Sequence, residues 1–151
     1  MCMRHRLRSV PVTDLAVFFG GLKQRGYTLG IATNDVEASA LGTIERFGLQ
    51  EAIDFAVGYD SGHGAKPGPG MALAFCAAVG LRPSEIAVIG DNAHDLDMGR
   101  SAGAGLLVGV LTGASERADH APLADHVIQN TALLPAPPRN LRAQHSWHWP
   151  A

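Results

Sequence analysis

The hydrophobic and polar positions of this 151-residue chain follow two different periods in turn. Short unbroken apolar runs are typical of buried strands, and apolar positions three or four residues apart are typical of amphipathic helices. The apolar runs predict strands at residues 27–33, 53–57, 86–89, 106–111 and 125–128. Helical spacing, with glycine, proline or a capping residue near the ends, predicts helices at residues 13–26, 34–48, 69–79 and 92–103.

The regular alternation of these strands and helices predicts the fold class. Strands joined through helices are typical of parallel pairing, so we expect an open, Rossmann-like parallel sheet with helices on both faces. This α/β core is expected over residues 13–134. A basic arm, residues 1–12, precedes it, and a proline-rich tail without core-like periodicity, residues 135–151, follows it.

Composition narrows the range of partners. The net charge of −2 provides no electrostatic footprint for nucleic acid or for an acidic membrane surface. No apolar run approaches membrane-spanning length. The chain has only two cysteines, at positions 2 and 76, which does not suggest a disulfide framework. We therefore expect a cytoplasmic protein that binds neither nucleic acid nor membrane.

The first polar feature lies at the end of the strand predicted at 86–89. Asp91 follows Gly90 at the expected start of a helix, and Asp95 lies one helical turn later, so both carboxylates can face the same side. Two carboxylates suit a hard cation such as Mg²⁺. The alternative is structural: Asp91 caps the helix, and Asp95 interacts with its positive end.

Two further features follow other predicted strands. The hydroxyl of Thr33 and the backbone amides of Asn34 and Asp35 could hold a phosphate oxygen, although the same cluster could simply cap a helix. Lys66 lies in a glycine-rich loop before Pro67 and is one of only two lysines in the chain. It is either a solvated surface residue or a positively charged phosphate ligand.

These features favour phosphoryl-transfer chemistry when they are taken together. The carboxyl ends of parallel strands meet at one edge of the sheet, where ligands bind in open α/β folds. A hydroxyl, a lysine and paired carboxylates at that edge could position a phosphate and neutralise its charge.

The same residues resemble the motifs of the haloacid dehalogenase superfamily of hydrolases, in particular its phosphoglycolate-phosphatase-like members. The resemblance covers roughly residues 11–134. It implies that Thr33 in Ile-Ala-Thr-Asn-Asp binds the transferring phosphoryl group and that Lys66 steadies the phosphate. It also implies that Asp91 in Gly-Asp-Asn-Ala-His-Asp ligates Mg²⁺ and that Asp95 supports the site. The implied substrate is a small phosphorylated metabolite.

One family feature has no counterpart in this sequence. Members of the superfamily begin with a strand that ends in Asp-x-Asp-x-Thr or Val, whose first Asp is the nucleophile, and a substrate-selecting cap domain usually follows. Neither precedes Thr33. The pair Asp95 and Asp97 lies within a predicted helix and is not assigned the nucleophile's role. We expect the absent strand to be the central one, so that its two neighbours either pair directly or leave a gap.

Two functional hypotheses therefore remain. The first is a magnesium-dependent phosphoric monoester hydrolase that is incomplete as this chain. The second is a non-catalytic fragment or interaction protein on the same fold. A non-hydrolytic phosphate or nucleotide binder is a third, weaker alternative, because no Gly-x-Gly-x-x-Gly motif or phosphate loop follows any predicted strand.

Overall fold

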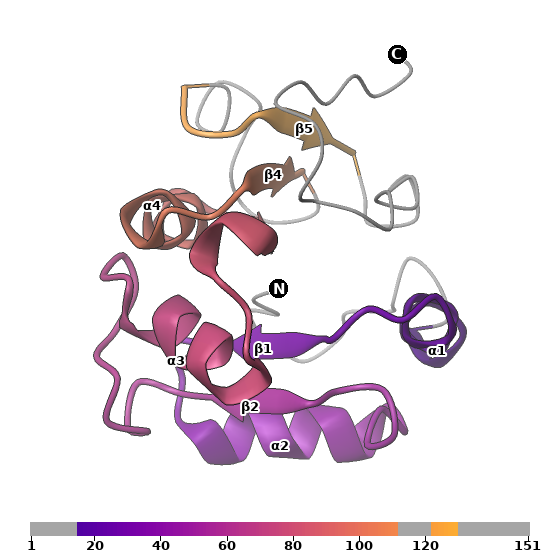
Figure 1. Ribbon diagram of the computed structural model, residues 1–151. Helices are drawn as coiled ribbons and strands as arrows, with labels where there is room; N and C mark the ends of the chain where they lie inside the picture. The colour runs from indigo at the N-terminus through magenta and orange to yellow at the C-terminus, as the bar shows by residue number, and fades with distance from the viewer. Residues whose placement is uncertain (1–14, 112–121, 130–151) are drawn as a thin grey trace.

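The computed structural model describes residues 15–111 and 122–129. Within these residues, helices and strands alternate as the sequence predicts (Figure 1). In chain order the elements are α1 (Leu15–Gln24), β1 (Gly30–Ala32), α2 (Glu37–Arg46), β2 (Phe55–Val57), α3 (Gly70–Val79), the 3-10 helix η1 (Pro83–Glu85), β3 (Ala87–Gly90), α4 (Ala93–Ala102), β4 (Leu106–Val110) and β5 (His126–Ile128). The arm at 1–12, the first two residues of the helix predicted at 13–26, and the tail at 135–151 lie outside the described residues.

Within residues 15–111 and 122–129, every strand pair is parallel, but the strands form two sheets instead of one. β1 pairs with β2, with Ile31 opposite Ala56. β4 pairs with β3 and with β5, with Ile89 opposite Val108 and Gly109 opposite Val127. Figure 1 shows β1 and β2 beside α2, apart from β4 and β5.

No strand of residues 15–111 or 122–129 pairs with the second edge of β1 or of β3. Of the two outcomes that the sequence allows, the described residues therefore show a gap between these strands and not direct pairing. The gap lies where the sequence analysis places the absent central strand.

Helices pack against both faces of the β1–β2 sheet, and two of them also pack against β3 and β4. On one face, α1 and α2 bury their apolar residues against Ile31 of β1. On the other, α3 and α4 pack against Val57 of β2, Val88 of β3 and Leu107 of β4. Neighbouring residues of β1 divide between the two faces, with Ile31 in the first cluster and Ala32 against the second, as expected for a strand. The fold is thus an α/β fold with parallel strands and helices packed against them.

Helix α3 spans the two sheets. It contacts β1, β2 and α4, and its Met71 and Cys76 belong to the same apolar cluster as Val88 of β3. Its Phe75 ring lies against Gly30 of β1, where a β-carbon would come within 2.7 Å of the ring. Glycine at this position therefore permits the close approach of α3 to β1.

The predicted element bounds need correction at several ends. β1 is confined to 30–32 because the backbone of Leu29 is bonded to Asp54, its N–H to the carboxylate and its carbonyl to the N–H of Asp54. α2 begins at Glu37, not at 34, and Pro69 precedes α3 instead of occupying its first position. The left-handed glycines at 26, 48 and 103, in contrast, follow their helices as predicted. No helix in the described ranges is both long and apolar enough to span a membrane.

Candidate functional site

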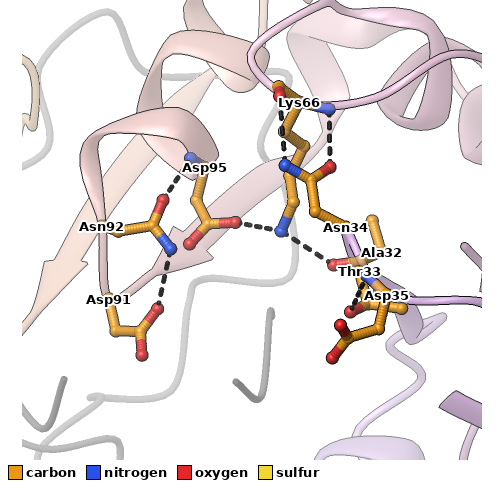
Figure 2. Close-up of polar contacts among 8 residues, drawn as sticks. All are labelled: Ala32, Thr33, Asn34, Asp35, Lys66, Asp91, Asn92 and Asp95. Carbon is orange, nitrogen blue, oxygen red and sulfur yellow. Dashed lines mark hydrogen bonds and ion pairs between the residues drawn. The ribbon is translucent and has the colours of Figure 1, made fainter. Parts of the chain in front are cut away.

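The polar residues singled out in the sequence meet at the carboxyl ends of β1 and β3. Thr33 follows directly after β1, and Asp91 follows directly after β3. Lys66 comes from the loop between β2 and α3, and Asp95 from the first turn of α4. The two sheets therefore contribute opposite sides of one polar cluster (Figure 2).

Lys66 is the residue that joins the two sides. Its side chain is 1% exposed, and its Nζ donates a hydrogen bond to the carbonyl oxygen of Ala32 at 3.0 Å and forms an ion pair with Oδ1 of Asp95 (Figure 2). The Asp95 side chain is 2% exposed. The structural alternative of a solvated lysine is therefore wrong: Lys66 is buried and bonded to groups from both sheets.

Asn34 holds the backbone of Lys66. Its side-chain Oδ1 accepts from the Lys66 N–H at 2.8 Å, and its Nδ2 donates to the Lys66 carbonyl at 3.1 Å. Asn34 precedes the start of α2 and does not belong to the helix. Its side chain therefore points toward the Lys66 loop and does not cap α2 (Figure 2).

Thr33 is buried, with 4% of its surface exposed. Its Oγ1 accepts a hydrogen bond from the backbone N–H of Asp35 at 3.0 Å. A hydroxyl can accept and donate at the same time, so this bond leaves the hydroxyl hydrogen able to donate to an anion. The same bond occupies the Asp35 amide, which the sequence suggests as one possible donor to a phosphate oxygen.

The loop that follows β2 is hydrogen-bonded to the first residue of α2. Asp60 Oδ1 accepts from the backbone N–H of Glu37 at 2.7 Å and so caps a helix whose own preceding residue, Val36, provides no side-chain cap. Ser61 accepts from the N–H of Gly58 at 2.9 Å and donates to the Glu37 carboxylate. These contacts fix the loop after β1 relative to the loop that leads to Lys66.

The turn into α4 positions the two acidic residues of the cluster. Asn92, not Asp91, is the capping residue: its Oδ1 accepts from the N–H of Asp95 at 3.2 Å, and its Nδ2 donates to Asp91 at 3.2 Å. Gly90 is required for close approach, since a β-carbon there would lie 2.1 Å from the Asp95 β-carbon. The turn thus places both carboxylates side by side (Figure 2).

The electrostatics of Asp91 and Asp95 are those of two acids held close together. Burial, followed by the negative charge of Asp95, raises the pKa of the Asp91 carboxyl above its ordinary value. The second carboxylate oxygen of Asp95, Oδ2, is buried and has no hydrogen-bond partner. A buried carboxylate oxygen without a partner costs free energy, and a bound cation would relieve that cost.

The structure thus brings together all five site residues expected from the sequence, namely Thr33, Asn34, Lys66, Asp91 and Asp95. Sequence reasoning missed the Ala32 carbonyl as a partner of Lys66, because backbone groups carry no sequence signal. It also missed Asn92 as the cap, although the spacing of Asn92 and Asp95 is that of a capping residue and the third residue of its helix.

Comparisons with known proteins identify the family of the chain. The haloacid dehalogenase-like hydrolase family model matches residues 8–103. The chain is 40% identical to the Dickeya dadantii protein named "Probable phosphatase IndB" over 82 residues. This aligned stretch covers 54% of this chain and 36% of the relative. It is 34% identical to phosphoglycolate phosphatase of Chromobacterium violaceum over 84 residues. That aligned stretch covers 56% of this chain and 38% of the relative.

Among solved structures, the fold is similar to that of a hydrolase from Pseudomonas syringae. The TM-score is 0.68 at 24% identity, and the match covers 77% of this chain and 55% of the other. The chain spans less than half the length of the two curated relatives described above. Since the family model matches well over half of its residues, the chain belongs to the haloacid dehalogenase-like hydrolase family.

Proposed function

We propose that this chain carries part of a magnesium-dependent phosphoric monoester hydrolase that acts on a small phosphorylated metabolite in the cytoplasm. The observation that supports the proposal most directly is the position of Lys66. Its buried ammonium lies between the Ala32 carbonyl and Asp95, where Thr33 and Asp91 also meet. A fixed cation beside a hydroxyl donor and two carboxylates suits the binding of a phosphoryl group together with a metal ion.

The acidic residues fit Mg²⁺ as the metal. Asp91 and Asp95 offer oxygen ligands, and the unpartnered Oδ2 of Asp95 is a ligand atom with no competing hydrogen bond. Within the described parts of the chain, no group of three His, Cys, Asp or Glu side chains gathers, so water and phosphate oxygens would complete the shell. When bound, Mg²⁺ would neutralise phosphate charge and orient the phosphoryl group.

The chain's own residues have separate roles in this proposal. Thr33 donates its hydroxyl hydrogen to a phosphate oxygen, and the ammonium of Lys66 attracts the phosphate while remaining paired with Asp95. Asn34 contributes to phosphate binding through its backbone N–H, because both polar atoms of its side chain are bonded to Lys66. These groups position the substrate and stabilise its charge, and none of them is assigned the role of nucleophile.

The gap between β1 and β3 favours a second candidate function. A non-catalytic protein on this fold needs neither a nucleophile nor a central strand between those edges, and residues 1–151 contain no Asp-x-Asp-x-Thr sequence. Such a protein could still bind phosphate and Mg²⁺ through the cluster. Turnover, and not binding alone, distinguishes the two candidates.

Magnesium is expected to bind with roughly millimolar affinity, mainly through Asp91, because two carboxylates form an incomplete shell. Asp91→Asn should abolish binding in a calorimetric titration. Without metal at pH 7, the same variant should raise Tm, because it removes a carboxylate whose ionised form the folded protein disfavours. The reason is that burial, followed by the negative charge of Asp95, raises the folded pKa of Asp91, so its stabilising contribution is present at low pH and is lost as pH rises through that folded pKa. Equal binding by the variant would remove Asp91 as the ligand.

Phosphate, or the analogue vanadate, is expected to raise Tm in the presence of Mg²⁺. Ligand at a hundred times its dissociation constant should contribute about 2.7 kcal/mol. Thr33→Val should weaken vanadate binding about 10- to 100-fold, since a hydrogen bond to a charged group contributes about 1.5–3 kcal/mol. Thr43→Val is the matched control, because it removes a bond to the Ser39 carbonyl on the exposed side of α2. Vanadate binding that is unchanged in Thr33→Val would place the anion elsewhere.

A further inference from the structure

Asn34 and Lys66 form a contact that the proposed chemistry does not by itself require. The two residues are 32 positions apart, yet the Asn34 side chain bonds to both main-chain polar groups of Lys66, accepting from its N–H and donating to its carbonyl. Paired hydrogen bonds of this kind fix both the distance and the orientation of the backbone they hold. We refer to this contact as the Asn34 clamp.

The clamp acts on a side chain that is also fixed at its other end. Lys66 Nζ is bonded to the Ala32 carbonyl and to Asp95, so the residue is held at its backbone by Asn34 and at its ammonium by groups from β1 and α4. A long lysine side chain ordinarily has many rotamers, and ordering it costs conformational entropy. Holding the backbone in place restricts the positions that the ammonium can reach.

We propose that Asn34 is a positioning residue whose side chain locks the loop of Lys66 so that the ammonium stays at the carboxyl edge of β1 and β3. Few side chains can replace it. Asparagine offers one acceptor and two donors on a short planar group, whereas ionised aspartate offers acceptors alone and alanine offers neither. Aspartate would keep the bond to the Lys66 N–H and would lose the bond to the carbonyl.

The clamp matters for the reaction because, under the proposed function, Lys66 meets the phosphate. A measurement of Lys66 itself can nevertheless succeed or fail independently of phosphate binding. The chain has only two lysines, Lys23 and Lys66, and their surroundings differ. The Lys23 side chain is 36% exposed and that of Lys66 is 1% exposed. Lys23 therefore serves as an internal reference in every sample.

The experiment is amine acetylation of the full chain with acetic anhydride, with the rate at each lysine followed by mass spectrometry. In the unmodified protein, Lys66 should react much more slowly than Lys23. Asn34→Ala should raise the ratio of the Lys66 rate to the Lys23 rate about 10- to 30-fold, because loss of two hydrogen bonds favours local opening of the loop. Asn34→Asp, which keeps one bond, should raise it about three- to fivefold.

The matched control is Asp60→Ala. It removes a hydrogen bond from the same group of loops, the cap on Glu37, without touching Lys66, and should leave the ratio unchanged. An unchanged ratio in Asn34→Ala would overturn the proposal. The proposal would also be overturned if Asn34→Ala raised the acetylation rates of both lysines equally, since that reports general unfolding. An equal rise of the rate ratio in Asp60→Ala would overturn it as well.

Discussion

Lys66→Met is expected to lower the free energy of unfolding by about 3–5 kcal/mol. The substitution leaves the Asp95 carboxylate, whose side chain is 2% exposed, buried without its countercharge. One oxygen of that carboxylate already has no hydrogen-bond partner, and loss of Lys66 would remove the ion pair of the other. Urea denaturation monitored by circular dichroism measures the change.

The chain provides a matched control for this prediction. Lys23→Met makes the same substitution at the ion pair of Lys23 with Asp54, whose side chains are 36% and 30% exposed. An ion pair at that exposure contributes at most about 1 kcal/mol, so this variant should remain nearly as stable as the unmodified chain. Equal destabilisation by the two variants would contradict the buried ion pair.

A double variant separates folding from binding. Lys66→Met combined with Asp95→Asn removes both charges of the buried ion pair and should recover at least half of the lost stability. It should nevertheless gain no thermal protection from vanadate and Mg²⁺, because the ammonium and one carboxylate are gone. Protection that survived in this folded variant would mean that the anion does not bind at Lys66.

Residues 1–151 alone are expected to show no meaningful phosphatase turnover, and fusion of an N-terminal strand ending in Asp-x-Asp-x-Thr is expected to restore it. Attack of a carboxylate on phosphorus would break the bond to the leaving alcohol and divide one difficult hydrolysis into two easier steps. The general acid/base that the segment also brings contributes about 10²–10⁴-fold in rate. Hydrolysis of an aryl phosphate with Mg²⁺ provides the assay.

Stability should rise together with activity in the fused protein. A strand between β1 and β3 would meet, on each side, an edge that no described residue pairs with, and apolar clusters would lie on both faces of β1. Each apolar side chain that it buries contributes about 1.5–3 kcal/mol. The fused chain with its first Asp changed to Asn is the control, since it should keep the stability and lose the turnover. Robust, Asp91-dependent turnover by the bare chain would refute the need for the added segment.

The sequence predicts some parts of this molecule better than others, for a physical reason. The turn from β3 into α4 depends on residues within a few positions of one another. The local sequence is therefore enough to predict the strand, the close turn at Gly90 and the two carboxylates. The order of strands and helices along the chain also indicates the fold class, because strands that alternate with helices pair in parallel. The predicted existence of these elements is confirmed.

The remaining features depend on contacts between distant residues. The burial of Lys66 depends on Asp95 and on the Ala32 carbonyl, and no local pattern indicates that these groups meet. β1 is shorter than its apolar run because Asp54, more than twenty residues away, bonds the backbone of Leu29. The separation of the sheets likewise depends on which strands find partners, a property that the individual apolar runs do not carry.

The division of the fold into two sheets has a mechanical consequence for the polar cluster. The boundary between the two sheets, here called the seam, runs through the cluster. Thr33 and Asn34 follow β1 on one side of it, and Asp91 and Asp95 follow β3 on the other. Across the described residues, no backbone hydrogen bond joins a strand of one sheet to a strand of the other. The seam is closed by side chains, through the apolar surface of α3 and the Lys66–Asp95 ion pair. The stiffness of the cluster is therefore that of side-chain packing and not that of a continuous sheet, whereas efficient catalysis requires groups held within about 0.5 Å.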